Sequence, residues 1–147
     1  MYLLDTQQVM DLFGRNEEKP IFAWLETAKP TDTDLFVSVV SLGQIAHAIE
    51  AMNGGQRNQW RRLFQEGRRR IEELGSVIDI DGAIVDVWQS DLRGDHLADI
   101  DGAEEDYGED DRLIIATAIA RNYALVSEGD RVLTEIAERT TLTLIEP

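Results

Sequence analysis

Short apolar runs alternate along this chain with longer amphipathic segments. The apolar, often β-branched runs predict buried strands at residues 1–5, 34–40, 76–80, 123–127 and 142–146. Between them, apolar residues recur every three or four positions and predict helices at residues 7–14, 20–29, 41–52, 58–74, 82–92, 111–122 and 131–139. Strands that alternate with helices indicate the α/β class. We therefore expect a three-layer α/β/α sandwich with a central parallel sheet.

Length and composition restrict the class of protein further. The 147 residues fit a single domain, residues 1–147, with a core of its own. Cysteine is absent, which excludes disulfides and thiolate zinc sites. The first thirteen residues lack the charged start and apolar run of a signal peptide, and no run of about 20 apolar residues suggests a membrane span. We expect a cytoplasmic protein without membrane contact.

The net charge of −15 is unevenly distributed. Residues 76–111 hold thirteen acids and one arginine, whereas six arginines lie within residues 57–70. Overall acidity argues against general nucleic-acid binding, because phosphates need positive charge. It remains compatible with an RNA enzyme whose metal ions neutralise its carboxylates, and with a basic protein partner. The arginines either contact RNA phosphates or form a solvated face with Glu66, Glu72 and Glu73 as local partners.

Acidic residues stand at the ends of the predicted strands. Asp5 ends the first strand, Asp110 and Asp111 open the helix before the fourth strand, and Asp130 follows that strand. Each acid alone is explained as a turn residue or helix cap. Together, at the carboxyl edge of one sheet, they predict a cation site, because clustered carboxylates repel one another without a cation. Oxygen ligands favour Mg²⁺ or Mn²⁺.

Four stretches of the chain resemble motifs of the PIN domain, and within that group of the VapC and FitB toxins of bacterial toxin–antitoxin pairs. "MYLLDTQQ" is similar to the family's M-x-L-L-D-T-N, and "VSVVSLGQIAHAIE" to V-S-V-V-T-L-G-E-I-x-x-G-I-E. "DRLIIATAIARNYALVS" resembles D-x-L-I-A-A-T-A-L-x-x-x-x-x-L-V-T, and the terminal "LIEP" is similar to the family's apolar-N-P. The resemblance implies a PIN-like fold over nearly the whole chain.

The same resemblance implies a metal-dependent ribonuclease in which acids bind Mg²⁺ or Mn²⁺ and two cations promote hydrolysis of a phosphodiester bond. Asp5 and Asp111 match the family's first and third acids. Gln44 replaces the second acid, and the fourth aligns with Gly129, one residue before Asp130. The implied partners are RNA as substrate, a VapB-like antitoxin as inhibitor, and a second copy of the chain in a homodimer.

Gln44 divides the functional hypotheses. Ser41 and Gln44 fit an S-x-x-Q capping box, which predicts a structural role for Gln44. Its amide oxygen is also able to coordinate a cation, but it carries no negative charge. The leading hypothesis is a ribonuclease with Asp5, Gln44, Asp111 and Asp130 in its active site, and with Asp110 as an additional metal ligand. The alternative is a PIN-like domain with weakened catalysis that serves as a protein-binding module.

Overall fold

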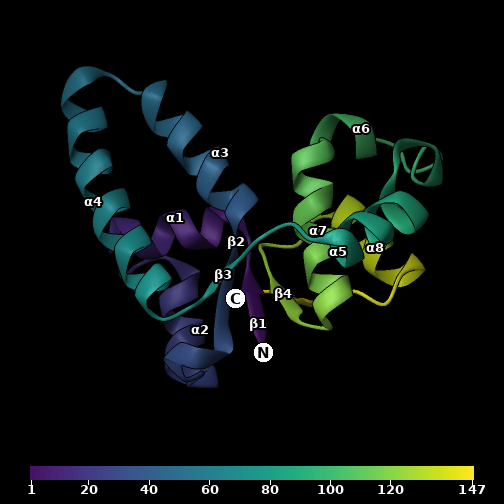
Figure 1. The fold of residues 1–147 in the computed structure, drawn as a ribbon, viewed down its shortest axis with the longest axis horizontal. Coiled ribbons are helices and arrows are strands. Elements are labelled where there is room, and N and C mark those ends of the chain that lie inside the picture. Colours follow the sequence, from purple (N-terminus) through teal and green to yellow (C-terminus); the bar gives the residue numbers. More distant parts are fainter.

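Five parallel strands form the centre of the computed structural model, which describes residues 1–147 (Figure 1). The strands run in the order β3-β2-β1-β4-β5. Their bounds are β1 Tyr2–Leu4, β2 Leu35–Ser38, β3 Val77–Ile78, β4 Ala124–Val126 and β5 Thr143–Ile145. In the centre, Leu4 pairs with Val37 of β2 and with Val126 of β4. The predicted α/β class with a central parallel sheet is confirmed.

Eight α-helices surround the sheet. They are α1 Thr6–Gly14, α2 Pro20–Ala28, α3 Val39–Glu50, α4 Gly54–Glu73, α5 Gly82–Val87, α6 Ala103–Asp106, α7 Glu109–Arg121 and α8 Arg131–Arg139. Short 3₁₀ turns span Asp32–Asp34 and Gly94–His96, and a π-helical turn spans Trp88–Leu92. None of the helices combines the length and the apolar character that crossing a membrane would require.

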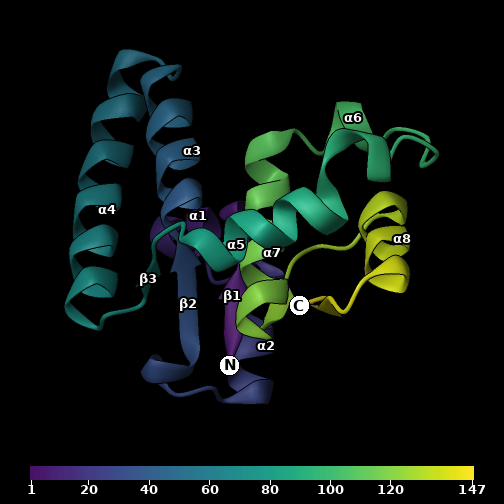
Figure 2. The ribbon, with the colours of Figure 1, turned by 45° about the vertical axis from the view of Figure 1, so that its right-hand side comes forward.

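Two apolar cores lie on opposite faces of the sheet, because successive residues of a strand point to opposite sides. Leu4 belongs to the core formed with α1, α2, α3 and α4, whereas its neighbour Leu3 belongs to the core formed with α5, α7 and α8. Figures 1 and 2 show the sheet between these two groups of helices. The layered α/β/α arrangement follows from this alternation.

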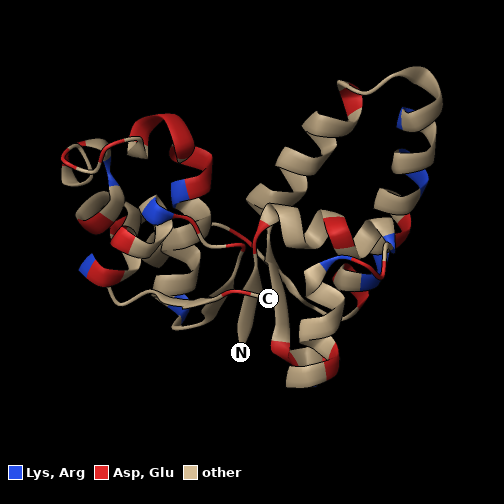
Figure 3. Ribbon diagram, turned by 180° about the vertical axis from the view of Figure 1, so that it is seen from behind, with Lys and Arg blue, Asp and Glu red and all other residues tan.

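Helices α3 and α4 form a long antiparallel hairpin that extends away from the sheet on the side opposite α6 (Figures 1 and 2). Trp60, Phe64 and Ile71 give α4 its apolar face, as predicted, although no residue of this helix is fully buried. Five of its six arginines are exposed to solvent, and Figure 3 shows the basic residues along the helix. Arg61 pairs with Glu50 at 2.8 Å and Arg68 with Glu72 at 2.7 Å. Local ion pairs thus engage part of this face.

The start of α3 differs from the prediction. Strand β2 ends at Ser38, and the Ser38 hydroxyl accepts a hydrogen bond from the Val40 N–H at 3.1 Å, so Ser38 is the N-cap. The predicted capping box with Ser41 as its first residue is therefore wrong. Ser41 lies inside the helix, fully buried, with its hydroxyl 3.1 Å from that of Thr6. The β-branched Val39 and Val40, expected in the strand, instead form the first turn of the helix.

The polar connection between residues 92 and 109 contains buried apolar residues among its acids. Leu97, Ile100 and Ala103 are almost fully buried in the core on the α7 side of the sheet. Apolar residues at three-residue spacing anchor this otherwise acidic segment, which then forms the single turn of α6. We refer to residues 93–107 as the acidic strap.

Gly67 marks the closest approach of α4 to the body of the protein. A Cβ atom at this position would overlap the aromatic ring of Phe13, whereas a Cβ at Gly55 of the same helix would meet no atom within 4 Å. Alanine at Gly55 therefore shows the effect of replacing a glycine of α4 without crowding, and alanine at Gly67 adds the crowding against Phe13.

We predict opposite effects on stability for alanine at these two positions. Gly55→Ala, in the first turn of α4, raises the free energy of unfolding by about 0.4–1 kcal/mol, because alanine has fewer conformations than glycine in the unfolded chain and its Cβ meets no atom here. Gly67→Ala lowers it by about 1–3 kcal/mol, because Phe13 has to leave its position. Urea unfolding of both variants measures the difference. Equal stabilisation of the two variants would contradict the close contact of Gly67 with Phe13.

Candidate functional site

A cleft of about 880 Å³ opens at the carboxyl ends of β1 and β4, between α3 and the start of α7. Its acidic lining residues are Asp5, Asp106, Asp110, Asp111 and Glu128. No lysine or arginine lines the cleft, and His47 of α3 is its only basic residue. Figure 3 shows acidic residues gathered around α6 and the start of α7, the elements to which Asp106 and Asp110 belong. An acidic cleft at this edge of a parallel sheet was predicted from the strand ends.

Asp5 lies at the floor of the cleft. Its N–H donates to the Val126 carbonyl at 3.1 Å, which places it beside Ser127 at the end of β4. One carboxylate oxygen caps α1 by accepting the Gln8 N–H at 2.9 Å, and the other accepts the Ser127 hydroxyl. Burial raises the pKa of Asp5, with Glu128 and Asp11 adding to the rise, and this outweighs the two hydrogen bonds that lower it.

Asp111 reaches the cleft from the first turn of α7, and Gln44 reaches it from α3. The Gln44 amide nitrogen donates to Asp111 at 2.9 Å, and the Thr6 hydroxyl donates to the Gln44 amide oxygen. Gln44 therefore connects the β1–α1 turn with α7 across the floor of the cleft. Its structural role is this bridge rather than the predicted helix cap.

Asp130 does not line the cleft. It is the N-cap of α8, where one carboxylate oxygen accepts the Leu133 N–H at 2.8 Å. The other oxygen accepts the hydroxyl of Tyr107 at 2.6 Å. Both oxygens are thus engaged by donors of the protein, and the structure shows the capping alternative for this residue.

Tyr107 is a residue of the cleft that the sequence analysis missed. Its pKa is raised by burial first, then by the hydrogen bond to Asp130 and by the charges of Asp130, Asp111 and Asp5. The phenol thus lies near three carboxylates that come from the end of β1 and from the starts of α7 and α8. Because Tyr107 is a single tyrosine in an acidic segment without a motif, nothing in the sequence indicated that it lines the cleft.

The remaining predicted positions lie at the rim or outside the cleft. Asp110 is exposed at the rim, in the first turn of α7. Gly129 carries no side chain, and a Cβ atom there would overlap the carboxylate of Glu146. The family's fourth acid therefore has no counterpart at this point of the fold.

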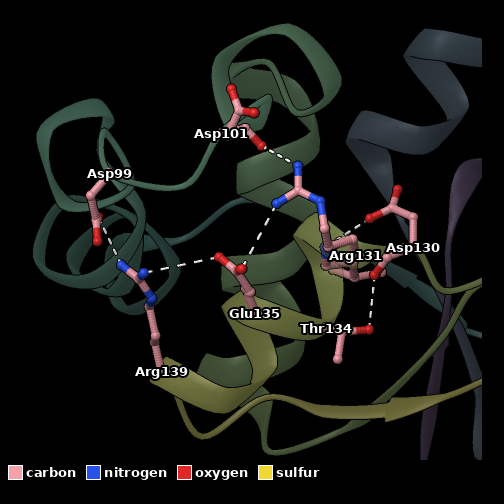
Figure 4. A network of polar contacts seen from close by, with 8 residues as sticks. Asp99, Asp101, Asp130, Arg131, Thr134, Glu135 and Arg139 are labelled. Carbon is pink, nitrogen blue, oxygen red and sulfur yellow. Dashed lines mark hydrogen bonds and ion pairs between the residues drawn. The ribbon is translucent and has the colours of Figure 1, made fainter.

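Arginines from α7 and α8 hold the acidic strap against the body. Arg112 is 2% exposed and donates to the carbonyls of Tyr107 at 3.0 Å and Leu92 at 3.2 Å. On the surface, Arg139 donates to Asp99 at 2.8 Å, and Arg131 donates to the Asp101 carbonyl (Figure 4). Asp106 and Tyr107 thereby stay at the edge of the cleft.

The donor set suits one hydrated Mg²⁺ or Mn²⁺. No group of three or more histidine, aspartate or glutamate side chains lies close enough to hold one ion. Asp5 and Asp111 supply two carboxylates, and Thr6 and Ser127 supply neutral oxygens beside them. Mg²⁺ commonly binds through one or two carboxylates, keeping water and substrate phosphate as its other ligands. The residues therefore fit a cation whose remaining ligands are water and substrate phosphate. They fit less well a cation whose ligands all come from the protein.

The fold and the cleft define a three-layer α/β/α protein with acidic residues at the carboxyl edge of its parallel sheet. A model of the PIN domain matches residues 2–139, and the chain belongs to the PIN domain family. The resemblance described from the motifs is thus confirmed. No curated protein sequence matches the chain.

Three solved structures share the fold over almost their whole length. VapBC2 from Rickettsia felis, bound to a DNA fragment from its promoter, has 20% identity and a TM-score of 0.67, covering 99% of this chain and 98% of that chain. FitAB bound to an IR36 DNA fragment has 18% identity and a TM-score of 0.66, covering 100% and 95%. FitAcB from Neisseria gonorrhoeae has 15% identity and a TM-score of 0.66, covering 99% and 96%. At these identities the likeness concerns the fold.

The raised pKa of Asp5 predicts a pH-dependent effect on stability. The folded state holds the Asp5 proton more tightly than the unfolded chain, so the contribution of Asp5 falls as pH rises from its unfolded pKa to its folded pKa. We expect Asp5→Asn to raise the free energy of unfolding at pH 7, with a gain that disappears below about pH 4. Asparagine keeps the helix cap.

Urea unfolding at several pH values measures this gain. Asp110→Asn, which removes an exposed carboxylate from the same cleft, serves as the control for the loss of a charge at its surface. A loss of stability at pH 7 in the Asp5→Asn variant would contradict the desolvation of this carboxylate.

Proposed function

We propose that the protein is a divalent-metal-dependent endoribonuclease of the VapC and FitB kind, a toxin that a cognate antitoxin inhibits. The observation that carries this proposal is the cleft with five acids and no lysine or arginine at the carboxyl ends of the strands. Membership of the PIN domain family supports the same chemistry.

The charges of the cleft explain why a cation is needed. Carboxylates repel one another and repel phosphates, and burial makes the ionised form of Asp5 costly. A cation held by Asp5 and Asp111 would polarise the phosphate and lower the pKa of a bound water. Thr6 and Ser127 orient the floor around these two acids through hydrogen bonds to Gln44 and Asp5. Both hydroxyls keep the charged groups in place without adding charge.

An antitoxin partner fits the same surface. The similar solved structures include VapBC2 and FitAB, each bound to DNA. A segment of basic residues from a VapB-like protein would be attracted to the acidic cleft and would exclude RNA from it. We further propose a homodimer as the resting assembly and the cytoplasm as the compartment, on the family resemblance and the absence of cysteine.

Removal of either floor carboxylate tests the proposed nuclease. We expect Asp5→Asn and Asp111→Asn each to lower the rate of Mg²⁺- or Mn²⁺-dependent RNA cleavage by about 100-fold or more, because each removes a charged ligand. Calorimetric titration with Mn²⁺ should show weaker binding in both variants. Asp81→Asn, which removes a carboxylate paired with Arg121 outside the cleft and keeps the cap of α5, is the control. Cleavage that persists in both floor variants without metal would refute the proposal.

A protein-binding module with weakened catalysis is the second candidate, and Gln44 is the observation that favours it. The amide donates to Asp111 at 2.9 Å, so a neutral group occupies one oxygen of a carboxylate that would otherwise face a cation. In that case the cleft keeps its acidic surface for a basic partner, while its affinity for metal is low.

Restoring an acid at this position distinguishes the two candidates. We expect Gln44→Glu to raise Mn²⁺ affinity by about tenfold or more, because a third carboxylate then joins Asp5 and Asp111. Gln7→Glu adds the same charge to the lining of the cleft, at a residue that bonds Asp11 instead, and is the matched control. If the protein is a module with weakened catalysis, RNA cleavage increases in the Gln44→Glu variant and not in the Gln7→Glu variant. Equal effects of the two substitutions would show that general charge, rather than the bridge, controls the site.

A further inference from the structure

Substrate affinity in this cleft has to come from a source other than ion pairs with phosphate. Proteins usually bind RNA backbones through lysine and arginine, and the cleft contains neither. His47 at the mouth is its only basic residue, against five acids. Besides the phosphate that the proposed cation would bind, the uncharged bases are a part of the substrate on which affinity and selectivity can depend.

Tyr107 is the only phenylalanine, tyrosine or tryptophan that lines the cleft. Tyr107 is half-buried: it packs against the core that contains α7, and it also lines the cleft. Single-stranded RNA is commonly recognised by stacking of unpaired bases on such aromatic side chains. The position of the ring thus matches a contact with a base beside the floor acids.

The ring is also held in place before any ligand binds. The Tyr107 carbonyl accepts from the buried guanidinium of Arg112 at 3.0 Å, and its N–H donates to the Ala103 carbonyl at 3.0 Å. At the other end, its hydroxyl donates to Asp130 at 2.6 Å, and Asp130 is itself fixed as the cap of α8. Both ends of the residue are therefore fixed, which lowers the entropy cost of stacking.

We infer that Tyr107 stacks on an unpaired base of the RNA next to the cleaved phosphate and so helps to select the substrate. This inference rests on the proposed nuclease function and adds a specificity-determining residue to it. Asp130 and Arg112 act as positioning residues: the first holds the phenol and the second holds the backbone of the strap.

Binding of a short single-stranded RNA, measured by fluorescence anisotropy with Ca²⁺ in place of Mg²⁺, tests this inference separately from cleavage. We expect Tyr107→Leu to weaken binding by about 5- to 150-fold, because one stacked base contributes about 1–3 kcal/mol. Tyr107→Phe keeps the ring and should bind within about threefold of the wild type. A hairpin RNA with every stem base paired and a short, tight loop should bind more weakly than the single strand.

Two control variants make the result specific. Tyr123 stacks on Phe36 with ring centroids 4.8 Å apart, outside the cleft, so Tyr123→Leu removes an aromatic ring without touching the site. Arg62→Gln with Arg69→Gln removes two exposed arginines of α4 that form no ion pair. Thermal unfolding by circular dichroism checks that each variant folds.

The possible outcomes separate the two proposals. Equal RNA affinity of wild type and Tyr107→Leu overturns the stacking role, and so does a loss of affinity in the α4 double variant alone, because phosphate contacts would then dominate. A wild type that neither binds the RNA with Ca²⁺ nor cleaves it with Mg²⁺ overturns the nuclease function together with this inference. Loss in Tyr107→Leu, with Tyr107→Phe and Tyr123→Leu near wild type, supports it.

Discussion

The parallel pairing of β1 with β4 is the constraint on which the site depends. Leu4 pairs with Val126. The residues that follow the two strands, Asp5 and Ser127, therefore meet at the carboxyl edge of the sheet. Asp5 must also cap α1, since the helix begins directly after it. The Asp5 carboxylate is therefore held both by the pairing of the strands and by its role as the cap of α1, and it loses much of its hydration. Its raised pKa is the electrostatic consequence of that position.

The opposite wall depends on a buried arginine. Residues 93–107 hold six acids and one arginine, so their charges repel one another, and the segment gains little from packing except at Leu97, Ile100 and Ala103. Arg112 compensates by donating to backbone carbonyls of the strap, and its 2% exposure makes these charge-assisted bonds stronger than surface pairs. Arg131 and Arg139 act at the surface, where ion pairs contribute less. The buried hydrogen bonds of Arg112 therefore fix the position of the acidic strap and of Tyr107 more strongly than the surface ion pairs do.

Hydrophobic periodicity was sufficient for the strand order along the chain and for the helices on both faces, because these depend on local pattern. It failed at the junction of β2 and α3, where Ser41 fits a capping pattern but Ser38 ends the strand and caps the helix. It also gave no information about partners that are distant in the sequence. Gln44 and Asp111 are 67 positions apart and Tyr107 and Asp130 are 23 apart, so no local pattern indicates their hydrogen bonds. Asp5 and Asp111 were found because strand ends and helix starts have positions that topology fixes. Asp130 was assigned to the cleft by the same logic, but its side chain turns to its own helix.

Gln44 and the acidic strap are best understood together. An amide in place of an acid removes one negative charge from the floor of the cleft, where burial already penalises Asp5. It also adds a donor to Asp111, so the floor is stable without a cation in a way that three carboxylates would not be. Meanwhile the strap and α7 bring Asp106 and Asp110 to the rim, where solvent screens their charge. Negative charge is therefore concentrated at the exposed rim rather than at the position of Gln44. For the proposed nuclease, such a cleft would attract cations and basic groups broadly and bind each one less tightly, so that selection of a substrate would depend on shape and stacking more than on charge.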